Sequence, residues 1–181
     1  MKASPVVILT GPPGSGKTTV ARLLAERCER SVHLESDMFF RWIVGGYVEP
    51  WLAESHEQNT LVMSVVADVA TAYSYAGYVT IVDGILVPGW FLEPVVDKLR
   101  SGGLDVGIVI LRPPLDVCFA RAASRRAEPL DEPAVIEQLW AGYSDLGDLE
   151  ESVIDNASHD PDATTDAVLR RLGAQLKDID R

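Results

Sequence analysis

The sequence contains little cysteine and no surplus of positive charge. Its two cysteines, Cys28 and Cys118, lie far apart in segments expected to be helical and do not form a metal-binding pair, so we expect reduced, buried thiols. Lysine and arginine total 16 against 27 aspartates and glutamates, which gives a net charge of −11. This charge disfavours binding to nucleic acid or to an anionic membrane, except through a local basic groove.

Long hydrophobic runs are also lacking. None approaches the roughly 20 residues that a membrane-spanning helix needs. Residues 1–4 lead directly into the first predicted strand, which leaves no room for a signal peptide. We therefore expect a cytoplasmic protein with a single domain over residues 1–181, and the sequence leaves open whether it is a monomer or a homodimer.

A phosphate-binding pattern is present near the start of the chain. The segment reads Gly11-Pro12-Pro13-Gly14-Ser15-Gly16-Lys17-Thr18 and fits G-x-x-x-x-G-K-[ST] at every fixed position. Glycines let the backbone N–H groups surround a phosphate. Lys17 is expected to reach the β- and γ-phosphates, and the Thr18 hydroxyl to ligate Mg²⁺. The predicted nucleotide contacts are Gly11, Gly14, Ser15, Gly16, Lys17, Thr18 and Thr19.

The surroundings of this pattern separate it from an ordinary glycine turn. Residues 5–10 form a continuous, largely β-branched apolar run, and residues 19–27 carry apolar side chains at helical spacing. Strand, glycine loop and helix follow in the order that phosphate binding needs, with the positive end of the helix dipole at the phosphates. The sequence predicts binding of a nucleoside triphosphate.

Strands and helices alternate along the rest of the chain. Further apolar strands are predicted over 31–35, 78–82, 106–111 and 152–155, and helices over 37–44, 55–76, 91–100, 115–126, 134–143 and from 161 onwards. Ser55 and Gln58 have the spacing of a capping box, and Asp160 precedes Pro161 as a helix cap. The pattern predicts an α/β fold, a five-stranded parallel sheet with helices on both faces.

Ligands of such sheets bind beyond the carboxyl ends of the strands. That edge is expected to collect Ser36-Asp37, Asp83-Gly84, Arg112 and Asp155-Asn156 with the glycine loop. We interpret Asp37, at the end of a strand placed beside the first strand, as the base that takes the proton of an acceptor hydroxyl. The alternative is a helix N-cap alone.

Asp83 ends an apolar strand, where a carboxylate can hold Mg²⁺ directly or through water. It is a candidate for metal or acceptor binding, and Gly84 for close approach of a substrate. A plain Asp-Gly turn is the alternative. Arg121 and Arg125 share one face of a predicted helix that ends near Arg126. They are candidates for phosphate or base contacts, or else form a solvated face.

Aromatic residues gather in the segments that should flank an acceptor. Trp42 and Trp51, with the polar Arg41 and His56, are candidate substrate contacts, and the aromatic rings favour a partly apolar acceptor. Packing in the core is the alternative for the aromatic side chains.

Taken together, these residues resemble the P-loop small-molecule kinases of the nucleoside-monophosphate-kinase-like group, such as chloramphenicol phosphotransferase, zeta-toxin-like kinases and gluconate kinases. The resemblance implies a P-loop nucleoside triphosphate hydrolase fold with Asp37 as base, a small helical lid over about 121–135, and Asn156 close to the adenine. The His-Pro and Asn pattern of gluconate kinases is missing after Asp37, so the acceptor stays open.

The sequence therefore predicts an enzyme that uses ATP and Mg²⁺ to phosphorylate a hydroxyl of a small-molecule acceptor. The alternative is a nucleotide-controlled switch or interaction ATPase without such an acceptor. Against a switch stand the short chain and the missing N-K-x-D guanine signature.

Overall fold

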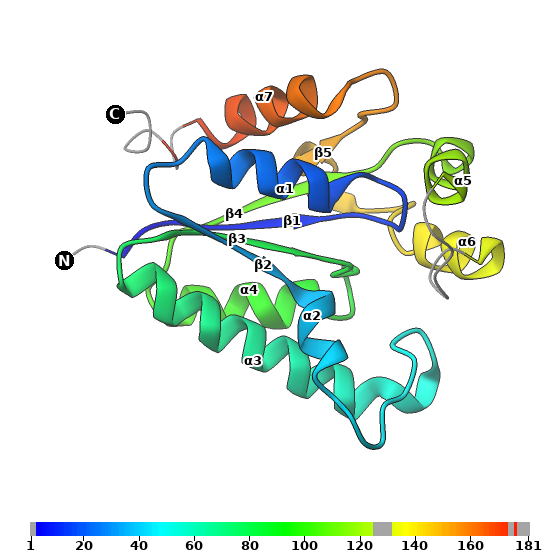
Figure 1. Cartoon of the computed structure of the whole chain (residues 1–181), viewed down its shortest axis with the longest axis horizontal. Helices are drawn as coiled ribbons and strands as arrows, with labels where there is room; N and C mark the ends of the chain where they lie inside the picture. The colour runs from blue at the N-terminus through cyan, green and yellow to red at the C-terminus, as the bar shows by residue number, and fades with distance from the viewer. Residues whose placement is uncertain (1–2, 125–131, 174–175, 177–181) are drawn as a thin grey trace.

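A parallel five-stranded sheet forms the centre of the protein. The computed structural model describes residues 3–124, 132–173 and 176. The strands follow the order β2-β3-β1-β4-β5, and every pair is parallel (Figure 1). Their bounds are β1 Val6–Thr10, β2 Ser31–Glu35, β3 Val79–Gly84, β4 Val106–Leu111 and β5 Val153–Ile154. The α/β fold predicted from the alternating pattern is confirmed.

Helices cover both faces of the sheet. In Figure 1, α1 (Lys17–Glu26) and α7 (Pro161–Leu172) lie above it, and α3 (His56–Tyr75) and α4 (Leu92–Ser101) lie below. Helix α2 (Ser36–Arg41) follows β2 on the lower side. Helices α5 (Leu115–Ala123) and α6 (Pro133–Ala141) lie beyond the carboxyl ends of the strands, at the right of the view. Short 3₁₀ segments occupy η1 (Ala53–Ser55) and η3 (Gly147–Ser152).

The alternation of side chains along β1 divides the core into two parts. Val6 and Ile8 pack with α3 and α4, whereas Val7 and Leu9 pack with α1 and α7. All five residues of β1 are buried, which explains why its sequence is a continuous apolar run rather than an alternating one.

The register of the sheet brings the functional loops to one edge. Thr10, the last residue of β1, lies opposite Gly84, and Glu35 at the end of β2 lies opposite Asp83. The expectation that β2 lies beside β1 was wrong, because β3 is inserted between them. Asp83, not Asp37, therefore ends the strand next to the P-loop strand.

Two of the expected helix caps are not formed. The hydroxyl of Ser55 donates to the carbonyls of Pro50 and Leu52, and the amide of Gln58 bonds to the backbone of Val48, so no capping box exists. Helix α2 begins at Ser36, which places Asp37 in its first turn rather than at the N-cap.

The third expected cap is present. The carboxylate of Asp160 accepts a hydrogen bond of 2.7 Å from the backbone N–H of Ala163, at the start of α7.

Within the described residues, no helix is long and apolar enough to cross a membrane.

Candidate functional site

The glycine loop joins β1 to α1 and adopts a conformation that favours glycine at three points. Gly11, Gly14 and Gly16 have positive φ of 151°, 79° and 89°. A side chain at Gly14 would also place its Cβ 2.4 Å from the carbonyl oxygen of Cys118 in α5. Lys17 begins α1 and is buried, with its ammonium 3.5 Å from the carbonyl oxygen of Pro12. The loop is thus fixed against α5, with the start of a ten-residue helix behind it.

Arg121 and Asn156 lie against this loop. One guanidinium nitrogen of Arg121 donates to the Ser15 carbonyl at 3.4 Å, and another to the Asn156 carbonyl at 2.8 Å. The Asn156 side-chain amide also donates to the Ser15 carbonyl, at 2.9 Å. Arg121 therefore points toward the loop and not into solvent. Arg125 lies outside the described residues, as does the rest of 125–131 within the expected lid.

A hollow of about 370 Å³ opens between the loop, α5 and α7. This volume is within the range of small-molecule sites. Four predicted nucleotide contacts line it: Gly16, Thr19, Arg121 and Asn156. The other lining residues were not predicted as nucleotide contacts: Val20, Ser124, His159, Pro161 and Thr164.

Unsatisfied polar atoms mark the same region. In the part of the chain that the structure describes, three buried side-chain atoms have no hydrogen-bond partner: Ser15 Oγ, Asp83 Oδ1 and Asn156 Oδ1. Leaving such an atom unpaired costs about 1–3 kcal/mol, so a cluster of them at one edge of the sheet calls for a partner. All three belong to residues predicted to bind nucleotide or metal.

Asp83 has the features of a magnesium ligand. Its side chain is 3% exposed, one oxygen lies 3.3 Å from Nε2 of His33, and the other oxygen is the unpaired one. The Thr18 side chain is exposed at the first turn of α1. Among the described residues, no three His, Cys, Asp or Glu side chains cluster as a protein-only metal site. One carboxylate and one hydroxyl suit Mg²⁺, which takes its other ligands from phosphate and water.

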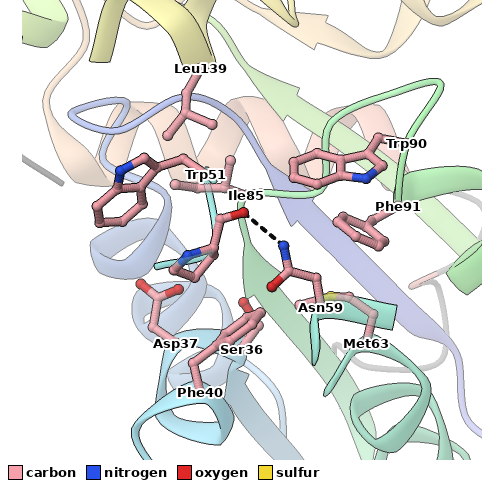
Figure 2. A pocket seen from close by; sticks show the side chains of 11 residues that line it. Ser36, Asp37, Phe40, Trp51, Asn59, Met63, Ile85, Trp90, Phe91 and Leu139 are labelled. Carbon is pink, nitrogen blue, oxygen red and sulfur yellow. Dashed lines mark hydrogen bonds between the residues drawn. The ribbon is translucent and has the colours of Figure 1, made fainter. Parts of the chain in front are cut away.

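A second, largely apolar pocket lies under α6, between α2, α3 and the segment after β3 (Figure 2). Asp37 and Trp51, both predicted substrate contacts, line it. The other lining residues are Ser36, Phe40, Pro50, Asn59, Met63, Ile85, Trp90, Phe91 and Leu139. Asp37 is the one charged side chain among these described lining residues.

Asn59 organises one wall of this pocket and was missed by the sequence reasoning. Its amide nitrogen donates to the Pro50 carbonyl at 2.7 Å, the contact drawn in Figure 2, and to the Ser55 hydroxyl at 2.9 Å. These bonds hold the loop that carries Trp51 against α3. The signal was present, since Asn59 lies on the same face of α3 as the apolar Val62 and Val66.

Other predicted substrate contacts lie elsewhere. Trp42 is 65% exposed and packs on Phe39, with ring centroids 4.6 Å apart, outside the described lining of the pocket. His56 lines a neighbouring hollow between α3 and α4. Arg41 is exposed near the end of α2.

Gly84 has a structural reason that differs from the expected one. A Cβ at this position would lie 2.1 Å from the Ser36 hydroxyl oxygen. The missing side chain thus lets the start of α2 pack on the end of β3, while the close approach of a substrate at Gly84 stays a prediction.

A buried tyrosine joins the segment after α6 to the end of β1. The hydroxyl of Tyr143 lies 2.8 Å from that of Thr10, which also bonds to both backbone groups of Leu86. Burial raises the pKa of Tyr143, so its hydroxyl stays protonated at neutral pH. Arg112, expected at the site, instead donates to the Tyr143 carbonyl and forms a two-bond ion pair with Glu150, which lowers the pKa of that carboxylate.

A match to a protein-family model shows which family the chain belongs to. The model of the AAA_33 family, described as an AAA domain, matches residues 6–145, from β1 through Tyr143. The chain belongs to the AAA_33 family. Its curated relatives include shikimate kinase of Corynebacterium diphtheriae, 36% identical over 101 residues (55% of this chain, 54% of the relative). Cytidylate kinase of Pyrobaculum calidifontis is 38% identical over 95 residues (51% and 50%). The chain thus spans about half the length of each of these relatives.

Solved structures confirm the fold of this AAA_33 domain. The Deinococcus radiodurans tunicamycin resistance protein has a TM-score of 0.71 at 19% identity, over 94% of this chain and 96% of the other. The Mycobacterium tuberculosis APS kinase, in complex with AMPPNP and APS, also has a TM-score of 0.71, at 18% identity over 96% and 99%. The domain is therefore a kinase-like P-loop domain with small-molecule kinases among its relatives.

Proposed function

We propose that this AAA_33 domain is an ATP-dependent phosphotransferase that moves the γ-phosphate to a hydroxyl of a small-molecule acceptor. The observation that carries the proposal is the position of Asp37. Its carboxylate lines a pocket that is separate from the nucleotide hollow and lies at the same edge of the sheet. A switch that only hydrolyses a nucleotide has no need for such a pocket with a carboxylate in it.

The residues divide the work between two sides. Lys17 neutralises charge on the β- and γ-phosphates, while Arg121 and Asn156 hold the loop and line the nucleotide hollow. Thr18 and Asp83 would hold Mg²⁺, which supplies positive charge to the phosphates. Asp37 takes the proton of the acceptor hydroxyl. At the same time the hydroxyl oxygen forms a bond to the γ-phosphorus, and the bond between the γ-phosphorus and the bridging oxygen of the β-phosphate breaks. The products are ADP and a phosphate monoester.

The net charge of −11 disfavours nucleic acid and anionic membranes as partners, so the proposed acceptor is a free small molecule. A cytoplasmic monomer or homodimer is the form that we propose for the enzyme.

Lys17→Ala tests the transfer itself. The change removes the ammonium that faces the phosphates, so we expect a loss of turnover of at least about 100-fold. The assay should follow ADP release and the phosphorylated product in the presence of a panel of hydroxyl compounds. Lys98→Ala, a lysine on α4 that pairs with Asp68, is the matched control. Wild-type turnover in folded Lys17→Ala protein would refute the proposal, whereas ADP release that no acceptor raises would favour the switch.

A further inference from the structure

The pocket at Asp37 has an unusual chemistry for a site that accepts phosphate. None of its described lining residues is a lysine or arginine, and its one charged group is the Asp37 carboxylate. Four of its eleven described lining side chains are aromatic: Phe40, Trp51, Trp90 and Phe91. In Figure 2 the indole of Trp51 lies to the left of Ile85 and that of Trp90 to the right.

The polar atoms of the pocket also favour an uncharged ligand over an anion. Both amide hydrogens of Asn59 are directed to Pro50 and Ser55, and its carbonyl oxygen, a hydrogen-bond acceptor, lies 3.5 Å from the amide nitrogen of Gln58. Asp37 also only accepts when ionised. The donors that remain on described side chains, such as the Ser36 hydroxyl and the Trp51 indole, are neutral. A carboxylate or phosphate, which itself only accepts hydrogen bonds, would find few partners here.

Three described cations near the pocket have partners outside it. Arg121 bonds to the P-loop, Arg112 pairs with Glu150, and Lys98 in the adjoining hollow pairs with Asp68 at 2.7 Å. Arg41 lies one turn beyond Asp37 on α2. Burial raises the pKa of Tyr47 to about 12, and the nearby carboxylates of Glu49 and Asp37 contribute to this increase. The positive charge of Arg41 acts in the opposite direction on the same pKa. An anion in the pocket would lose its water without gaining a positive charge from any described lining residue, and the Asp37 carboxylate would repel it.

Resting on the proposed phosphotransfer, we infer that the acceptor is an uncharged molecule whose hydroxyl is attached to a flat or apolar ring, and that organic anions are excluded. Ring faces pack well against the aromatic walls. The hydroxyl, a donor, pairs with the Asp37 carboxylate. Charge repulsion by Asp37 and the absence of a cation among the described lining residues provide the discrimination against carboxylates and phosphates.

Matched pairs of ligands test this inference by binding. Each pair shares a single ring and one hydroxymethyl group and differs in charge, as do para-hydroxymethylbenzamide and para-hydroxymethylbenzoate, because the pocket volume is only about 50 Å³. Calorimetry with a nonhydrolysable ATP analogue, which fills the phosphate site, should show the neutral member binding at least about tenfold more tightly. Shikimate, gluconate and cytidylate serve as further anionic probes.

A reversal of charge inside the pocket sharpens the test. Leu139→Lys places a cation in the pocket wall from α6 and should reverse the preference toward the carboxylate member of each pair. Ala134→Lys, an exposed position on the same helix, adds the same charge outside the pocket and should keep the wild-type order. The melting temperature of each variant checks folding, and the wild-type comparison stands without them.

The outcomes separate the inference from the proposed function. Tighter binding of anions, or no tighter binding by the neutral member of any pair, overturns the inference. Neutral ligands that bind and compete for the Trp51 pocket but are never phosphorylated uphold the inference and refute the phosphotransfer.

Discussion

Asp37 is the residue on which the proposed chemistry depends most. It is exposed in the first turn of α2 and points its carboxylate into the acceptor pocket. Asp37→Asn keeps the shape and removes the charge, so turnover should fall by about 10²–10⁴-fold, the usual contribution of a general base. ATP affinity should be unchanged, because the phosphates are held by the loop and Lys17.

Stability separates this role from a structural one. Asp37 is not the N-cap, so the part of its stabilising effect that comes from the helix N-terminus is about 0.3–1 kcal/mol. Turnover, ATP affinity and melting temperature are measured on one preparation, with the exposed Asp97→Asn as control. Turnover within about twofold of wild type would exclude Asp37 as the base.

Residues differed in how far the sequence could reveal them. The glycine loop was evident, because few functions other than phosphate binding need its spacing. Asp37 and Trp51 could be named but not placed. Ile85 and Leu139 escaped notice, because an ordinary apolar residue becomes a pocket wall only through packing between elements far apart in the chain.

The contact between β3 and α2 is the element-scale feature that positions Asp37. Gly84→Ala would place a methyl group 2.1 Å from the Ser36 hydroxyl and push the start of α2 away from the sheet. We expect a loss of about 1–3 kcal/mol in the free energy of unfolding, as for other overpacked sites, together with a fall in turnover. Urea unfolding and the ADP-release assay measure the two effects.

A double-mutant cycle isolates that contact. Ser36→Gly removes the hydroxyl and the Cβ that crowd position 84, so the double variant should be more stable than the sum of the two single losses predicts. If the two losses simply add, the contact with Ser36 is not the reason why Gly84→Ala destabilises the protein.

At the level of elements, the bounds of the strands could be predicted from the sequence, but the order in which the strands lie in the sheet could not. Apolar runs identified all five strands within one or two residues of their observed bounds. The insertion of β3 between β1 and β2 depends on pairing across long stretches of chain, which a local pattern does not encode. The 3₁₀ segment η3 had no periodic signal and was likewise missed.

Tyr143 links parts of the whole molecule, since its buried hydroxyl joins the segment after α6 to Thr10, at the end of β1. Tyr143→Phe removes one buried hydrogen bond, for which we expect a loss of about 0.5–1.5 kcal/mol. In a protein of this size, 1 kcal/mol lowers the melting temperature by about 2–4 °C. Tyr73→Phe, in which the tyrosine is 38% exposed, is the control for the loss of a hydroxyl. Equal melting temperatures for the two variants would contradict a stabilising role.

The central place of β1 has a consequence for how the protein is made. Val6–Thr10 pair with β3 on one side and with β4 on the other, yet β4 follows roughly a hundred residues later in the chain. At about 5–20 residues per second, a ribosome needs roughly 5–20 s to supply that second partner. Both edges of this apolar strand are unpaired until β3 is made, and one edge is still unpaired until β4 is made, which is the state in which a strand tends to aggregate. We therefore expect a chaperone to protect the strand that carries the P-loop during this interval.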